Sequence, residues 1–210
     1  MSEARRYYGK YRGVVVSAID PERRGRLQAI VADVTGDFPS TWALPCVPYA
    51  EPSHGALALP QPGASVWIEY EYGDPDRPIW SGCFWDEAQP LPPAASSIPP
   101  GTRGLALAVD GSTLVLRADR SGDGGVALET EGGAKIRVHQ EGLVLENAGA
   151  KVTLDGAGVT VEKERGEITL KVGATTLKVS ESGITLECGA SKVELSAAQL
   201  DLNRGSLTVT

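Results

Sequence analysis

This 210-residue sequence has no aromatic residue after Trp85 and no proline after Pro100. The four tryptophans, six tyrosines and two phenylalanines all lie between Tyr7 and Trp85, whereas seventeen of the 25 glycines follow Pro100. A segment without aromatics has to build its core from aliphatic side chains, and a segment without proline can form uninterrupted ladders of strand hydrogen bonds. The composition therefore predicts two chemically different parts joined near residue 90.

The sequence also lacks the features of several protein classes. No run of about 18 apolar residues could span a bilayer, and the start has no apolar stretch typical of a secretory signal, so we expect assembly in a cytoplasm. The net charge of −7 disfavours nucleic-acid binding. Three distant cysteines, Cys46, Cys83 and Cys188, argue against a disulfide framework and against a CxxC metal site.

Motifs of catalysis are missing as well. The sequence contains no GxSxG, HExxH or phosphate-binding glycine loop. The acidic residues Asp74, Asp76, Asp86 and Glu87 lie in turn-like sequence, not in a helix-and-cleft setting that could separate two pKa values for glycoside cleavage. We therefore expect no enzymatic activity.

Residues 1–88 carry short alternating apolar stretches between turn signals, at 11–19, 26–34, 65–72 and 78–85, which predicts β-strands. About five strands in some eighty residues suggest a small antiparallel barrel. Its tryptophans either fill the core or form stacking platforms for oligonucleotides or sugars, and the lack of a Lys/Arg groove favours the core. One barrel turn has Asp side chains suited to cap backbone amides and an arginine to pair with one of them: Gly73, Asp74, Pro75, Asp76, Arg77 and Pro78.

After residue 88 the composition changes twice. The proline-rich segment 89–101 predicts a semi-rigid linker. Strand-like stretches of irregular spacing follow in residues 102–141. From Gly142 onward, two apolar residues flank one polar residue, and the next pair follows after seven or nine positions, as Val152/Leu154 does after Leu143/Leu145. One short strand per roughly eight residues, with glycines between them, is typical of a β-solenoid.

Each strand of this repeat has one apolar face and one polar, charged face. Two aliphatic side chains per strand, without aromatics, are too few to offset the ordering of a lone chain. Three chains that share one axial core of valine, leucine and isoleucine solve this problem. We therefore predict a homotrimer, with a trimer core made of Leu143, Leu145, Val152, Leu154, Val159, Val161, Ile168, Leu170, Leu177, Val179, Ile184, Leu186, Val193, Leu195, Leu200 and Leu202.

Several motifs resemble the central spike family of contractile tails, which includes phage baseplate assembly protein V and the valine-glycine repeat (VgrG) spike of type VI secretion systems. These motifs are GRL at 25–27, WALP at 42–45, LPQPGASVWIEYEYGDPDRPIWSG at 59–82, and the glycine-punctuated repeat up to the end. The resemblance implies an all-β protein with an OB-fold-like barrel (1–88), a proline-rich linker (89–101) and an intertwined trimeric β-helix needle, or β-prism (102–210).

The resemblance also implies a structural function. The barrels would sit on the baseplate hub and tail tube, and sheath contraction would drive the needle through the target cell envelope. Assembly would take place in the bacterial cytoplasm, into a phage tail or an injection particle. A tip protein with the proline-alanine-alanine-arginine (PAAR) repeat would contact the C-terminal end, here Leu207, Thr208, Val209 and Thr210.

The sequence departs from some members of that family. Small phage spikes can close their apex with a His-x-His motif that binds iron, but the only histidines here are His54 and His139. We therefore expect no metal and no cofactor, and a separate tip protein instead. Some relatives also carry a lysozyme or an effector. Because only the short linker separates the two parts and the sequence ends with the repeat, we expect neither of these domains here.

Two other functions compete with the spike. A trimeric adhesin or carbohydrate-binding stalk would use the barrel as its binding module. A left-handed β-helix acyltransferase would have hexapeptide steps and a catalytic histidine in the repeat, and the seven- and nine-residue spacing opposes it. A binding experiment with the barrel would distinguish the two hypotheses. The stalk requires the barrel to bind a glycan, whereas the spike requires it to bind a tube or hub protein.

Overall fold

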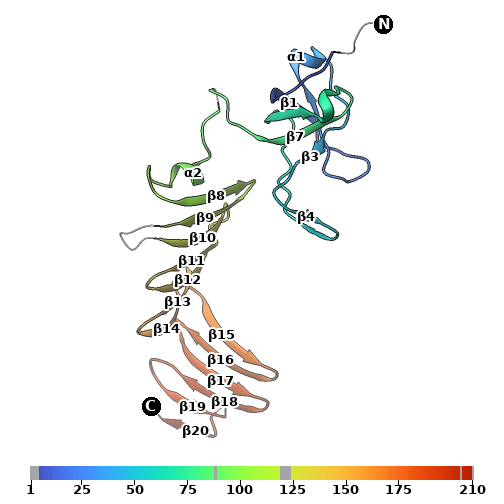
Figure 1. Cartoon of the computed structure of the whole chain (residues 1–210). Coiled ribbons are helices and arrows are strands. Elements are labelled where there is room, and N and C mark those ends of the chain that lie inside the picture. The colour runs from blue at the N-terminus through green and yellow to red at the C-terminus, as the bar shows by residue number, and fades with distance from the viewer. Residues whose placement is uncertain (1–4, 88, 119–123, 204, 210) are drawn as a thin grey trace. The chain divides into compact units, whose positions relative to one another are not determined.

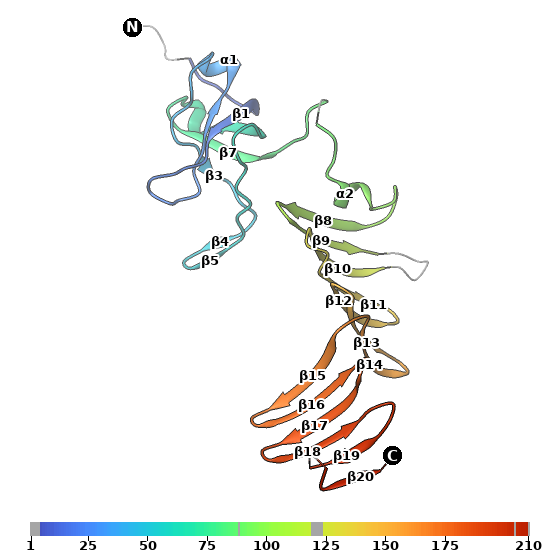
Figure 2. The same ribbon diagram turned by 180° about the vertical axis from the view of Figure 1, so that it is seen from behind.

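The computed structural model describes residues 5–87, 89–118, 124–203 and 205–209 as an almost entirely β protein (Figures 1 and 2). The chain forms two compact units, Met1–Leu91 and Pro92–Thr210. The finer boundaries expected at residues 88 and 101 stay predictions. Within the described residues, no helix has the length and apolar character needed to cross a membrane. The predicted all-β fold class is confirmed.

The first unit is a five-stranded sheet that curls into a small barrel. Its strand order is β2-β1-β6-β7-β3, antiparallel except for the parallel pair β3 and β7. Leu27 and Ala43 exchange two backbone hydrogen bonds, of 3.2 and 2.7 Å, and so join the start of β2 to the start of β3. The elements are β1 (Tyr11–Ser17), β2 (Gln28–Ile30), α1 (Ala32–Thr35), β3 (Leu44–Pro45), β4 (Ala50–Glu51), β5 (His54–Gly55), β6 (Ser65–Tyr70), the 3-10 turn η1 (Glu71–Gly73) and β7 (Pro78–Cys83).

The core of the barrel follows from strand alternation. Along β6, Val66, Ile68 and Tyr70 point inward and are buried, because successive side chains of a strand face opposite sides. Trp80 of β7 is buried too, and its Nε1 donates a hydrogen bond to the carbonyl oxygen of Gly25 at 3.1 Å. Burial raises the pKa of Tyr70 to about 12. The other members of this core cluster are Val15, Leu27, Ala29, Val31 and Ala43.

The other tryptophans do not enter this core fully. Trp67 packs against Phe84, with ring centroids 4.5 Å apart, and the guanidinium of Arg12 lies over both rings. Trp85 remains exposed. The interpretation that the tryptophans fill the barrel core therefore holds for Trp80. Trp67 and Phe84 instead lie together on the outer surface of the sheet.

The turn after β1 is organised by a carboxylate that the sequence pattern did not single out. Asp20 accepts hydrogen bonds from Nε and an Nη of Arg26, at 3.1 and 2.7 Å, and from the backbone N–H groups of Glu22 and Arg24. The Asp20 side chain is only 4% exposed, and the Arg26 guanidinium lies over the Trp42 ring. These contacts, the Arg26 hydrogen bonds first, hold the pKa of Asp20 well below its usual range.

The second unit consists of two antiparallel sheets in which each strand pairs with its neighbours in sequence (Figure 1). Ala94 of the short helix α2 (Pro93–Ser96) is buried, and the helix contacts β8 and β9. The first sheet contains β8 (Gly104–Val109), β9 (Ser112–Arg117), β10 (Gly125–Thr130), β11 (Lys135–His139), β12 (Gly142–Asn147), β13 (Ala150–Asp155) and β14 (Gly158–Lys163). The second contains β15 (Glu167–Val172), β16 (Thr175–Ser180), β17 (Gly183–Cys188), β18 (Ser191–Leu195), β19 (Leu200–Leu202) and β20 (Leu207–Val209).

Candidate functional site

The first sheet of the second unit presents a continuous apolar face. Its register places apolar residues of neighbouring strands directly opposite each other, as in Leu145 opposite Val152 and Val152 opposite Val161. The result is two parallel columns that run across all seven strands. One column is Leu105, Leu116, Val126, Val138, Leu143, Leu154 and Val159, and the other is Leu107, Leu114, Leu128, Ile136, Leu145, Val152 and Val161.

The second sheet repeats this arrangement. Ile184 of β17 lies opposite Val179 on one side and Leu195 on the other, and Leu186 lies between Leu177 and Val193. The columns begin at Ile168 and Leu170 and continue to Leu200 and Leu202. All sixteen residues proposed for the trimer core thus lie on the apolar face of their sheets. That three chains meet on this face stays a prediction.

Within the described part of the second unit, no second layer of the same chain covers the apolar face. Among the described residues, the buried apolar side chains all lie between Val15 and Trp80, apart from Ala94. Aliphatic residues of the columns remain exposed instead, for example Leu186 at 45% and Leu195 at 48%. A soluble monomer rarely leaves so long an apolar surface in water, so this surface is a candidate assembly site.

The opposite face is polar and charged, as the alternation predicts. One column of directly opposed residues alternates in charge across five strands: Glu129, Lys135, Glu146, Lys151 and Glu162. Diagonal contacts add ion pairs between Arg137 and Glu129 at 3.0 Å and between Lys178 and Glu167 at 3.3 Å. Opposite charges on neighbouring strands stabilise this face by about 0.2–1 kcal/mol per pair and oppose slippage of the register.

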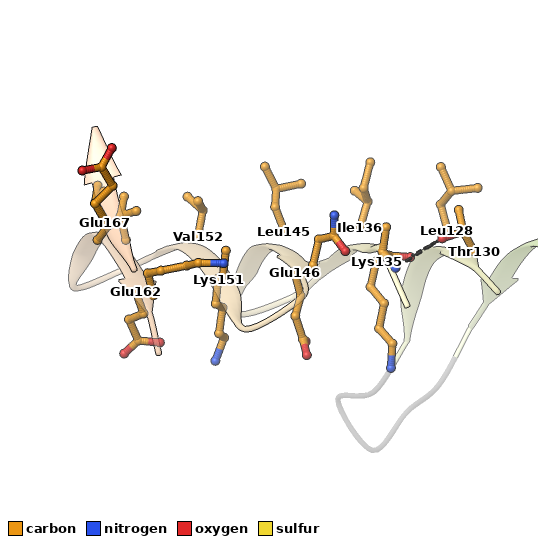
Figure 3. A pocket seen from close by; sticks show the side chains of 16 residues that line it. Leu128, Thr130, Lys135, Ile136, Leu145, Glu146, Lys151, Val152, Glu162 and Glu167 are labelled. Carbon is orange, nitrogen blue, oxygen red and sulfur yellow. Dashed lines mark hydrogen bonds between the residues drawn. The ribbon is translucent and has the colours of Figure 1, made fainter. Parts of the chain in front are cut away.

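A groove of about 410 Å³ follows one apolar column from β10 to β15. Leu128, Ile136, Leu145 and Val152 line it and point to the same side, whereas Lys135, Glu146, Lys151 and Glu162 point away from it (Figure 3). Among the described residues, no group of three or more His, Cys, Asp or Glu side chains is arranged to hold a metal ion. What the groove offers is apolar surface.

The C-terminal end and the barrel turn were the other predicted sites. In β20, the exposed Leu207 lies opposite Leu202, and Thr208 pairs with Asp201, while Thr210 lies outside the described residues. Val209 pairs with Leu200.

In the turn Gly73–Pro78, Asp74 accepts a hydrogen bond from the backbone N–H of Asp76 at 3.1 Å. Arg77 does not pair with either aspartate in the contacts that the structure shows. Its guanidinium lies 2.6 Å from the carboxylate of Glu71, because η1 brings that residue back across the turn.

Two family models match this chain. Residues 11–85 match the type VI secretion system/phage-baseplate injector OB domain, and residues 106–165 match the phage baseplate V C-terminal trimerisation domain. The chain is also similar to the type VI secretion system spike protein VgrG4b of Pseudomonas aeruginosa, with 34% identity over 56 residues. That similarity covers 27% of this chain and 7% of the relative, so the chain spans only a small part of the relative's length.

Proposed function

Since the chain belongs to the family of phage baseplate V and VgrG spike proteins, we propose that it is the central spike of a contractile injection machine or phage tail. In this proposal three chains form one spike. Their barrels mount it on the baseplate hub and the tail tube, and the second units form a needle that punctures the target envelope when the sheath contracts. Assembly takes place in the bacterial cytoplasm.

The observation that carries the proposal is the uncovered apolar face of the needle. Each strand supplies the same two aliphatic positions, and their columns run without a polar interruption through each sheet. Three such faces turned toward one axis would bury each other and leave the charged faces in water. The match to a trimerisation domain over residues 106–165 supports this number of chains.

The ladder of hydrogen bonds supports the mechanical part of the proposal. Strands lie across the needle, and within each sheet every inner strand is bonded to both neighbours, so a load along the needle is shared by many backbone hydrogen bonds. Leu207 leaves an apolar side chain exposed at the last strand. We propose that a PAAR-type tip protein covers this end, around Leu207, Thr208, Val209 and Thr210.

The native mass of the full chain tests the proposal most directly. We expect a particle of about 66 kDa, three times the 22.0 kDa of one chain, by mass photometry or sedimentation equilibrium. A stable monomer at micromolar concentration would contradict the shared core. Antibody labelling of assembled tails should then place the needle at the baseplate end, and a label elsewhere would contradict the role as a spike.

A further inference from the structure

The charged face of the first sheet carries a second groove, which we call the outer groove. Its volume is about 850 Å³, within the range of sites that hold small organic molecules. The groove extends from α2 across β9, β10 and β11 to β12 and β13. Its lining includes Val115, Arg117, Ala127, Arg137, His139 and Val144. These six residues lie on the face opposite the apolar columns, so the proposed trimer core does not use them.

The segment around α2 closes one end of the outer groove. A Cβ atom at Gly104 would lie 2.7 Å from the side chain of Ile98, so the residues that follow α2 pack on the charged face of β8. Ala94 of α2 is buried and lines the groove together with Pro93 and Ser97. The helix thus covers this face at β8 and β9, and the groove continues from that cover over β10 and β11.

The floor of the outer groove consists of small residues of β10. Gly125 lies directly between Arg117 of β9 and His139 of β11, and Ala127 follows on the same face. Gly125 cannot carry a side chain, because a Cβ atom there would lie 2.0 Å from the carbonyl oxygen of Val138. Since neighbouring strands lie about 4.8 Å apart, β9 and β11 face each other across about 10 Å of this low floor. One small polar group fits into that width.

Three side chains with N–H donors surround the floor: Arg117, Arg137 and His139. An Nη of Arg137 donates to Glu129 at 3.0 Å, and a guanidinium carries five N–H donors in all. Nδ1 of His139 accepts the backbone N–H of Glu141 at 3.3 Å, so the proton of the neutral ring lies on Nε2, which becomes the donor. The three side chains therefore bring both positive charge and N–H donors to one place.

Acidic side chains in the lining have cations of their own. Glu129 pairs with Arg137, and Glu146 lies directly opposite Lys135 and Lys151 in the column of alternating charge. Glu141 lies in the turn between β11 and β12. These pairs reduce the repulsion that an anion would meet in the groove.

We propose that the outer groove binds a phosphate monoester with an aliphatic body. The three terminal oxygens of such a phosphate match the three donor side chains Arg117, Arg137 and His139, and hydrogen bonds between charged groups are stronger than those between neutral ones. Val115 and Val144 offer aliphatic surface for the rest of the ligand. The second unit has no aromatic side chain on which a sugar or a base could stack. All of these residues belong to one chain, so the site does not depend on the proposed trimer.

Isothermal titration calorimetry of the full chain with hexyl phosphate tests this site. We expect the native protein to bind it, and Arg117→Gln, which removes one cation, to bind it about tenfold or more weakly. Ala127→Leu fills the floor while it keeps all three donors, and it should abolish binding. The matched control is Lys178→Gln, which removes a cation from the same face of the second sheet and should bind like the native protein.

Two fragments of the ligand separate its parts. Inorganic phosphate should bind more weakly than hexyl phosphate because it lacks the aliphatic body, and hexanol should not bind because it lacks the phosphate. Far-UV circular dichroism and native mass establish that each variant keeps its fold and its assembly. No binding of hexyl phosphate at millimolar concentration would overturn the proposal. Unchanged binding by Ala127→Leu, or an equal loss in Lys178→Gln, would also overturn it, since either result indicates unspecific attraction to charge. Because the spike is judged by native mass, it stands or falls separately.

Discussion

At the scale of single residues, Asp20 links the barrel's stability to pH. Its pKa is lowered in the folded protein, chiefly by the hydrogen bonds from Arg26, so the folded state favours the charged carboxylate. This stabilisation is fully present above the ordinary pKa of 3.8 and is lost as the pH falls below it. We expect the barrel to lose thermal stability steeply below about pH 4.

Asp20→Asn tests this effect. It removes the charge that Arg26 faces, so we expect the melting temperature at pH 7 to fall by several degrees and its acid dependence to flatten. Tryptophan fluorescence reports on the barrel alone, since all four tryptophans lie in it. Glu22→Gln, which touches the same guanidinium from an exposed position, serves as the control and should have a smaller effect. Equal losses in the two variants would contradict the dominant role of Asp20.

Three glycines at strand starts, Gly125, Gly142 and Gly183, each lie so close to a backbone carbonyl oxygen that a side chain would not fit. At Gly183 the backbone has φ +143°, and a Cβ atom there would lie 2.0 Å from the carbonyl oxygen of Leu195; Gly142 has the same relation to Leu154. Gly183→Ala should destabilise the needle by about 1–3 kcal/mol per chain, measured by thermal unfolding in far-UV circular dichroism. Gly156→Ala, where a Cβ meets open space, should change stability by less than about 0.5 kcal/mol.

At the scale of elements, the two faces of one strand should respond oppositely to the same substitution. Ile184 lies in an apolar column, whereas Thr185 lies on the charged face beside Lys178 and Glu194. Ile184→Asp would bring three carboxylates into the shared core and should abolish trimers at micromolar concentration, because burial of unpaired charge is very unfavourable. Thr185→Asp should leave trimers intact. Normal trimers from Ile184→Asp, seen by mass photometry, would contradict the inward face.

The strands of the needle could be predicted because a two-residue alternation is a local property. The pairs from Leu143/Leu145 onward fall in the strands observed, and the irregular stretch 102–141 continues the same columns. In the barrel, the stretch 26–34 was expected as one strand but contains β2 followed by α1. Leu27, Ala29 and Val31 are buried in the core and Val34 of α1 packs against it, so the apolar pattern alone does not show where the strand ends and the helix begins.

Other features depend on contacts that a periodic pattern does not contain. The break between the two sheets of the second unit, after β14, is invisible in sequence, because the apolar pairs continue across it with a nine-residue step from Val159 to Ile168. The Asp20–Arg26 pair spans a turn, and the pairing of Arg77 with Glu71 depends on the left-handed backbone of Tyr72, with φ +55°. The break and both ion pairs depend on the backbone geometry of turns. The alternation of apolar and polar residues along a strand contains no information about that geometry.

At the scale of the whole molecule, the repeat allows the second unit to become longer or shorter while the number of apolar residues per strand stays the same. Every strand of the second unit adds the same two aliphatic positions to the apolar face of its sheet, and neighbouring strands lie about 4.8 Å apart. Gain or loss of one hairpin would therefore change the reach by about 10 Å while each remaining strand keeps its neighbours. A protein built this way can change the length of its second unit by duplication or deletion of whole hairpins, without redesign of a single position on the apolar face.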